Sequence, residues 1–241
     1  MKKLFVLVLT SIPFAGMAQS DDFGIYTSLD VVKTVSNRLH IGVGAEYRSH
    51  DNAKTTDRYS LGMTADSKLL HWLSVGAGYD FLNDNIEKYS YSATNAPLKY
   101  AKYWRPRHRF HLDFTGKVVL ANFKLSLRER WQYTYIPEKN IDGQYDYILE
   151  SDDDIPVTYY GTGDNLLRSR VKLECVTHTF ITPYASVEMY NGWKVEKMKY
   201  IVGADFSVSA NHKLGLYYMY QTVSSSVPKI HIVGTGYKYC F

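Results

Sequence analysis

The chain has 241 residues and a formal net charge of +4, with 45% hydrophobic and 22% charged residues, so it is neither disordered nor fibrous. Tyrosine is abundant at 22 residues although the mean hydropathy is negative at -0.28, and beyond the N-terminus no apolar stretch is long enough for a membrane-spanning helix. Two cysteines, Cys175 and Cys240, exclude a disulfide framework. Whether these two cysteines form one disulfide bond with each other is left open by the sequence.

The N-terminus has the three parts of a secretory signal peptide. Lys2 and Lys3 precede an apolar run that begins at Leu4, and small residues surround position 18. We expect residues 1–18 to be cleaved before Gln19, which would leave residues 19–241 as a single domain. Loss of the two lysines brings the net charge to about +2. Export and this nearly neutral charge both argue against nucleic acid as a partner.

Alternation of apolar with polar or small residues predicts strands along the whole mature chain. The pattern gives about 11 strand candidates, several of them near the length of about 10 residues that a tilted strand needs to cross a bilayer. Their ranges are 23–31, 39–48, 59–65, 73–81, 110–118, 123–127, 167–173, 184–190, 198–208, 214–220 and 233–241. The first is weak, and residues 87–92 alternate faintly. Because single-chain bacterial barrels usually have an even number of strands, we predict 10 to 12.

The connections between these segments alternate in length. Short turns are expected at residues 36–38, 67–71, 119–122, 176–179 and 209–212, and longer loops at 50–57, 84–104, 137–164, 191–196 and 223–229. Short turns at one rim and long loops at the other are typical of outer-membrane barrels. We therefore predict an all-β, antiparallel, up-and-down transmembrane barrel in a bacterial outer membrane, with short periplasmic turns and long extracellular loops.

The last strand ends on an aromatic residue. Tyr237, Tyr239 and Phe241 lie at every second position up to the final residue. A terminal aromatic on an amphipathic strand resembles the signal that the outer-membrane barrel assembly machinery reads. That machinery is thus an expected partner during biogenesis, along with outer-membrane lipid.

Several short motifs together resemble the uncharacterised barrel family known as domain of unknown function 2490. They are WRPRHRF at 104–110, LRERWQY at 127–133, LRSR at 167–170, ASVE at 185–188, YYMYQ at 217–221 and GTGY at 234–237. The resemblance covers nearly the whole mature chain. It implies an outer-membrane location in a Gram-negative cell, and it supplies no activity, ligand or catalytic residue.

On three consecutive strands, basic residues occupy the positions that alternate with the apolar residues, so their side chains point to the opposite face of the sheet. Because an arginine facing lipid near the midplane costs roughly 2–4 kcal/mol, this face is expected to line the lumen. The predicted basic ladder contains Arg107, Arg109, His111, Arg128, Arg130, Arg168, Arg170 and Lys172, and the acidic residues beside it are Asp113, Glu174 and Glu188. Glu129 does not fit this scheme, because strict alternation places its side chain on the outer face. A position near a rim, or a β-bulge, would remove the conflict.

Two interpretations of the ladder stay open. In one, the arginines pair with inward carboxylates, including those of Glu46, Asp80 and Asp205, and fill the lumen with a salt-bridged plug. In the other, a surplus of arginine attracts small anionic solutes into a narrow pore. The plug is the plainer interpretation because small barrels have little room once side chains fill them.

Other classes of function have weaker support. His108, His111, Ser126 and Glu188 could form a hydrolytic set acting on lipid, but no catalytic motif surrounds any serine or cysteine. The histidines lack metal-ligand spacing, so we expect no metal and no cofactor. A soluble secreted β-protein is the remaining alternative. We therefore predict a non-enzymatic barrel.

Overall fold

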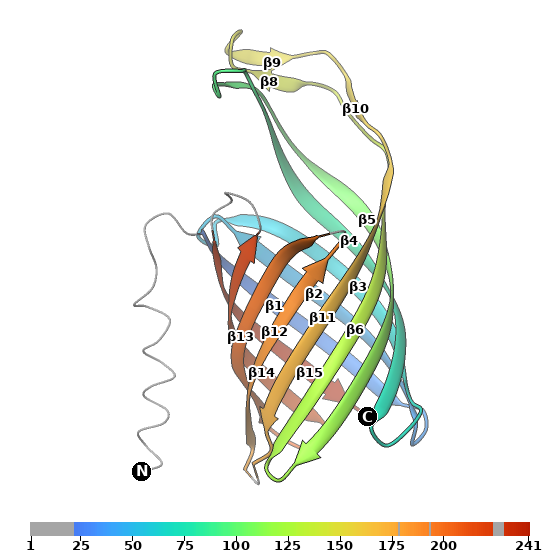
Figure 1. Ribbon diagram of the computed structural model, residues 1–241. Coiled ribbons are helices and arrows are strands. Elements are labelled where there is room, and N and C mark those ends of the chain that lie inside the picture. The colour runs from blue at the N-terminus through green and yellow to red at the C-terminus, as the bar shows by residue number, and fades with distance from the viewer. Residues whose placement is uncertain (1–21, 178, 193, 224–228) are drawn as a thin grey trace, which may run out of the picture.

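The computed structural model describes residues 22–241 except for 178, 193 and 224–228. The chain is a single sheet closed into a barrel, with a smaller arm projecting beyond one end (Figure 1). No helix in the described part of the chain is long and apolar enough to cross a membrane.

Eleven long strands form the barrel wall. They are β1 (Asp22–Thr34), β2 (Leu39–His50), β3 (Thr55–Lys68), β4 (Leu73–Tyr91), β5 (Pro97–Leu120), β6 (Phe123–Ile136), β11 (Thr162–Cys175), β12 (Ile181–Asn191), β13 (Val195–Ser207), β14 (His212–Val223) and β15 (Ile230–Cys240). Sequential strands are antiparallel neighbours, as predicted. The odd number lies within the predicted range, and the weak first candidate is a full wall strand.

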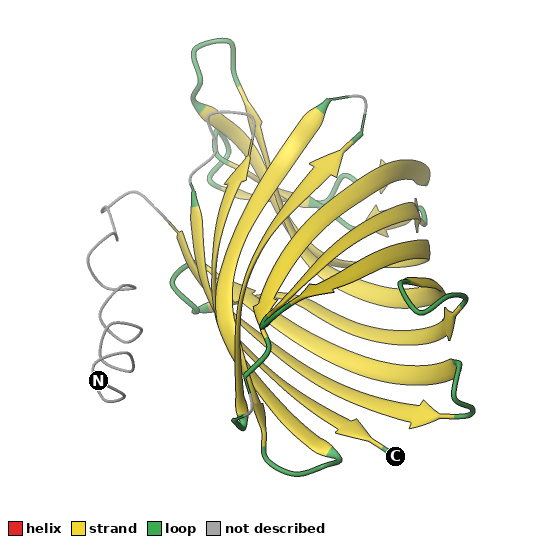
Figure 2. Cartoon of the chain, turned by 60° about the horizontal axis from the view of Figure 1, so that its bottom comes forward, coloured by secondary structure: helices red, strands yellow, loops and turns green. Residues whose placement is uncertain are grey.

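The barrel closes through a parallel pairing of β1 with β15. The register runs from Asp22 opposite Ile230 to Val32 opposite Cys240. Strands alternate in direction, so the first and last of an odd-numbered set must point the same way. Both strands run from the rim that carries the longer connections, here called the loop rim, toward the rim that carries the short ones, here called the turn rim (Figures 1 and 2). The described chain therefore begins at one rim and ends at the other.

The arm rises from the loop rim and corrects one prediction. Residues 84–104 do not form a loop, because β4 continues to Tyr91 and pairs with β5 from Pro97 onward. The connection from β6 to β11 contains four short strands: β7 (Lys139–Ile141), β8 (Gln144–Asp146), β9 (Ser151–Asp153) and β10 (Val157–Tyr159). β8 pairs with β5 in this extension and β9 pairs with β8, whereas β7 and β10 pair with each other. Arg105 joins the parts by donating to the carbonyl oxygens of Pro137, Tyr159 and Tyr160 at 2.8–3.0 Å.

An ion pair also holds β9 against the extended hairpin. The Lys99 ammonium donates to the Asp153 carboxylate at 2.5 Å. This hydrogen bond holds the pKa of the Asp153 carboxyl below its ordinary value and raises the pKa of Lys99. The arm is thus fixed by polar contacts with the barrel strands.

The outer face of the wall is apolar. Alternate residues such as Val43, Leu61 and Phe114 are more than half exposed, while their neighbours along each strand are turned to the interior. Glu129 has this outward parity without any register shift in its strand pairing. Its carboxylate accepts a hydrogen bond at 2.6 Å from the Ser169 hydroxyl of the neighbouring strand. The hydrogen bond, and not a bulge, accommodates this residue.

The two cysteines are free and are not bridged to each other. Cys175 ends β11 and Cys240 ends β15, both at the turn rim. The bridge that the sequence left open is therefore absent from the structure.

The parallel closure predicts which residues can be joined across it. Thr27 lies opposite Thr235, and adjacent strands about 4.7–4.9 Å apart are within the span of a disulfide. In a background with Cys175→Ser and Cys240→Ser, the pair Thr27→Cys and Thr235→Cys should cross-link on oxidation, as seen by gel mobility of the unfolded chain. The pair Thr27→Cys and Val233→Cys, displaced by two residues, should not. Preferential cross-linking of the displaced pair would contradict this register.

Candidate functional site

The three strands β5, β6 and β11 lie side by side and form one wall of the lumen. Their register places Asp113 opposite Arg130 and Arg130 opposite Arg168. All of the predicted ladder and its acidic neighbours are buried or half-buried, whereas many of the alternate residues of the same strands, such as Phe110, Leu127 and Val171, are exposed. This set comprises Arg107, Arg109, His111, Asp113, Arg128, Arg130, Arg168, Arg170, Lys172, Glu174 and Glu188. These residues therefore lie on the less exposed side of their strands.

Two buried carboxylates hold three of the arginines. Glu188 accepts hydrogen bonds from Arg128 at 2.8 Å and from Arg168 at 3.0 Å through the same carboxylate oxygen. Asp113 accepts from both the Nε and the Nη2 of Arg130, at 2.6 and 2.7 Å. Such charge-assisted and bidentate bonds fix the guanidinium planes. This part of the ladder is a salt-bridged network.

His111 lies between two carboxylates in the same network. Its ring nitrogens are 3.6 Å from Asp80 and 3.7 Å from Asp113, and only 3% of the residue is exposed. The facing position on β4 is Gly78, where a Cβ atom would come within 2.4 Å of the imidazole ring. Glycine at this position is therefore what leaves room for the ring.

Lys124 of β6 and Lys172 of β11 complete the network near the turn rim. Glu174 accepts from Lys124 at 2.5 Å and pairs with Lys172 at 3.2 Å. Lys172 also approaches Asp205 at 3.8 Å. These two lysines are thus paired with carboxylates.

Sequence reasoning missed the charged residues of the other strands at the loop side. Asp84 of β4 pairs with Arg58 and, at 3.0 Å, with Arg107. Arg48 of β2 pairs with Glu46 at 2.6 Å and lies over the Tyr26 ring at 4.6 Å. The available signal was the same alternation, since Arg48 shares the inward parity of Glu46.

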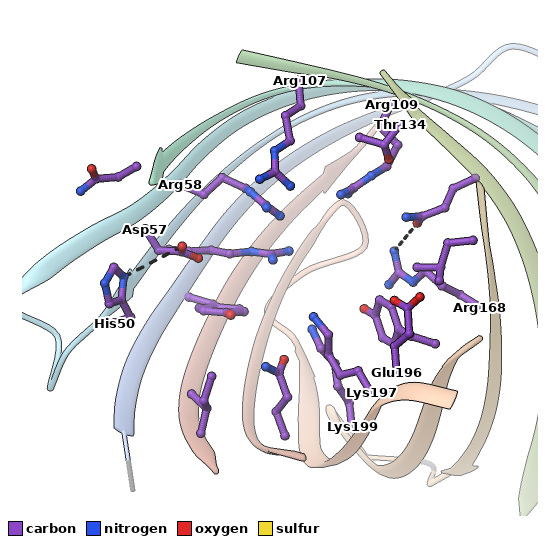
Figure 3. Close-up of a pocket in the computed structure, with 18 of the residues that line it drawn as sticks. His50, Asp57, Arg58, Arg107, Arg109, Thr134, Arg168, Glu196, Lys197 and Lys199 are labelled. Atoms are coloured by element: carbon purple, nitrogen blue, oxygen red, sulfur yellow. Dashed lines mark hydrogen bonds and ion pairs between the residues drawn. The ribbon is translucent and has the colours of Figure 1, made fainter. Parts of the chain in front are cut away.

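Lys197 and Lys199 of β13 also line the lumen and were also missed. Both alternate with the outward Met198 and Tyr200, and Lys199 is 6% exposed. Figure 3 shows the two lysines pointing toward the same space as Arg109 and Arg168. The basic lining therefore extends over a second wall.

Three adjoining cavities occupy the lumen. The loop-side cavity has a volume of about 570 Å³ and is lined in part by Arg107, Arg109 and Lys197. A central cavity of about 270 Å³ and a turn-side cavity of about 460 Å³ follow. Arg48 lines all three. The salt bridges thus leave space along the lumen.

Four of the lumen cations form no ion pair with any described residue. They are Arg109, Arg170, Lys197 and Lys199, which line the three cavities. The Nε atom of Arg109 is buried without a hydrogen-bond partner. The lumen therefore carries positive charge that the described carboxylates do not neutralise.

The remaining walls have a different lining. Inward positions of β2 and β3 include Gly42, Gly44 and Gly62, all lining the turn-side cavity. Near the parallel closure, Tyr26, Met219 and Ile232 form a buried apolar cluster. Glycines and apolar side chains therefore interrupt the charged lining on these strands.

The residues considered for lipid hydrolysis do not share a face of the sheet. His108 has the outward parity of Phe110, and its Nδ1 lies 2.7 Å from the Tyr79 hydroxyl. His111, Ser126 and Glu188 have inward parity. The Ser126 hydroxyl makes only a long contact of 3.5 Å with the Lys172 carbonyl oxygen.

The three terminal aromatic residues lie at the turn rim. Tyr237 lies 2.5 Å from the Nδ1 of His212, and the rings of Tyr239 and Phe241 stack at 5.6 Å. Lys33 of β1 lies over the Phe241 ring at 5.5 Å. These contacts connect the end of the chain to both of its neighbouring strands.

The shared carboxylate of Glu188 predicts a stability effect. In Glu188→Gln, two arginines lose their buried counter-ion, and breaking such a pair costs about 3 kcal/mol or more. We expect the urea midpoint of the folded barrel in detergent to fall. The matched variant Asp152→Asn removes a carboxylate from the arm and should leave the midpoint unchanged. Equal midpoints for wild type and Glu188→Gln would contradict the role of this carboxylate.

Comparisons with known proteins agree with this architecture. Among solved structures, the β domain of the Bordetella autotransporter BrkA is 12% identical with a TM-score of 0.57, and 86% of each chain is covered. The translocator domain of the autotransporter NalP from Neisseria meningitidis is 10% identical with a TM-score of 0.46, covering 78% of this chain and 70% of that one. No curated protein matches significantly.

The family described as "Protein of unknown function (DUF2490)" matches residues 23–230, which is most of the chain. The resemblance noted from the sequence motifs is thereby confirmed. The fold is a closed β-barrel similar to that of the β domain of the autotransporter BrkA. This chain belongs to the DUF2490 family.

Proposed function

We propose that this protein is an outer-membrane barrel that lets small anions pass through a narrow lumen. The location is supported by the apolar outer face and by the barrel fold. It is also supported by the signal peptide expected at residues 1–18, a segment that lies outside the described residues. The terminal aromatics Tyr237, Tyr239 and Phe241 would engage the assembly machinery.

The observation that carries the channel proposal is the set of adjoining cavities lined by unpaired cations. Glu188 and Asp113 neutralise three arginines of the ladder, but the cavities retain Arg109 and Arg170 without a carboxylate partner. Fixed positive charge along a water-filled path favours anions over cations. The plug and the pore thus coexist, with the salt bridges forming one wall of the path. No catalytic step is part of this proposal.

Conductance of single molecules tests the proposal. The purified mature chain in a planar bilayer with a salt gradient should give steady steps whose reversal potential indicates anion preference. Arg170→Gln removes one unpaired lumen charge and should weaken this preference. Lys54→Gln makes the same charge change at an exposed position after β2 and should leave the preference unaltered. A folded but silent barrel, or a preference for cations, would overturn the proposal.

The glycine-lined wall predicts where the path can be narrowed. A Cβ atom at Gly44 would lie 2.5 Å from the Asp30 carboxylate, beside the turn-side cavity. Gly44→Val should therefore reduce conductance, by roughly half or more in so narrow a lumen. Gly116 has outward parity and nothing within 4 Å of an added Cβ atom, so Gly116→Val is the control. Equal conductance of the two variants would show that ions do not pass through the turn-side cavity beside Gly44.

A further inference from the structure

Three cations converge on one aromatic ring in the loop-side cavity. The guanidinium carbon of Arg168 lies 4.5 Å from the centre of the Tyr190 ring, the Lys197 ammonium 5.0 Å and the Lys199 ammonium 5.3 Å. Among these cations, only Arg168 is ion-paired, with Glu188. Like charges so close together repel one another. The arrangement therefore favours an additional anion.

Lys199 is the most deeply placed of these cations. The residue is only 6% exposed and lines both the loop-side and the central cavity. Its ammonium has ring contacts with Tyr26 at 6.0 Å and with Tyr190, and no carboxylate within ion-pair distance among the described residues. A buried charge without a counter-ion is costly. An anion in the cavity would remove that cost.

A further cation faces the same space from the ladder. Arg109 lines the loop-side cavity, and its buried Nε atom donates no hydrogen bond. Figure 3 shows its guanidinium extending into the space toward which Lys197 and Lys199 point. Two walls of the barrel thus supply donors to one space.

Acidic side chains of the cavity lie nearer its mouth. Asp22 is the first residue of β1 and Glu196 the second residue of β13, both at the loop rim. Asp57 faces His50 at 3.9 Å. The carboxylates therefore border the entrance, and the unpaired cations lie deeper.

Neutral hydrogen-bonding groups complete the lining. Thr134 and Gln221 are 8% and 6% exposed and border the same cavity. The volume of about 570 Å³ is within the range of small-molecule sites, which run from about 300 to 1,000 Å³. A ligand with both an anionic group and hydroxyl groups would match these surroundings.

We propose that the loop-side cavity binds small soluble organic phosphates through Lys197, Lys199 and Arg109. A phosphate monoester has several acceptor oxygens and a charge near −2 at neutral pH, so it can neutralise more than one of these cations at once. Chloride supplies a single charge and no directional acceptor geometry. The inference rests on the proposed function in that it names the class of anion, but binding itself requires only a cavity open at the loop rim.

Isothermal titration calorimetry of the detergent-folded mature chain tests this site. Glucose 6-phosphate and inorganic pyrophosphate should bind, and glucose should not. The double variant Lys197→Gln and Lys199→Gln should weaken binding at least about tenfold, since a hydrogen bond to a charged group contributes about 1.5–3 kcal/mol. Arg109→Gln tests the wall of β5, β6 and β11 independently. Circular dichroism and heat-modified gel mobility establish that each variant is folded.

The controls separate the site from its alternatives. Lys54→Gln should bind as the wild type does. Unchanged affinity in both lumen variants, or equal binding of glucose, would overturn the site. Phosphatidic acid in the micelle should not compete, and competition would overturn the assignment to a soluble solute.

Binding and conduction can fail separately. Binding in a barrel that is silent in the bilayer would retain the site and overturn the channel. Anion-selective conductance without phosphate binding would retain the channel and overturn the site.

Discussion

The structure depends on closing a sheet so that the backbone hydrogen-bonding groups of its first and last strands have partners. An unpaired edge strand in hydrocarbon would leave a row of costly unsatisfied amides. Here the edge is removed by pairing β1 with β15 over a continuous parallel register from Asp22 to Val32. Parallel pairs are slightly less stable per residue than antiparallel ones. The side-chain contacts beside this closure, including the apolar cluster around Ile232, therefore matter more than elsewhere in the wall.

The same closed topology explains why the predicted basic ladder lies on adjacent strands. In an up-and-down barrel, neighbours in sequence are neighbours in space, so the charges between Arg105 and Glu174 collect on adjacent strands. Burying so many cations requires counter-charges, and Glu188 and Asp113 supply them within the same wall. The inward glycines of β2 and β3 leave room on another wall. Salt bridges and open space can therefore occupy one narrow barrel.

Much of this could be predicted from the sequence because a strand with one apolar face repeats every two residues. That period located the wall strands and turned the ladder from Arg107 to Lys172 inward. It failed for residues 84–104, since the part of this hairpin that extends beyond the barrel wall has no regular apolar outer face to impose alternation. It also missed the apolar lining at Met219, where the outward Tyr218 and Tyr220 make both faces apolar. The sequence could not predict whether the number of strands is odd or even, because that number depends on how the whole sheet closes.

The charged residues that the sequence analysis missed lie far in sequence from the predicted ladder. Lys197 and Lys199 had the right parity, but β13 is far in sequence from the ladder on β5 and β6. Only the curvature of the closed sheet brings Lys199 to a cavity shared with Arg109. A cation in an isolated strand can be solvated, whereas the same cation facing others across a narrow lumen needs a counter-ion. The chemistry of the lumen therefore follows from closure of the sheet.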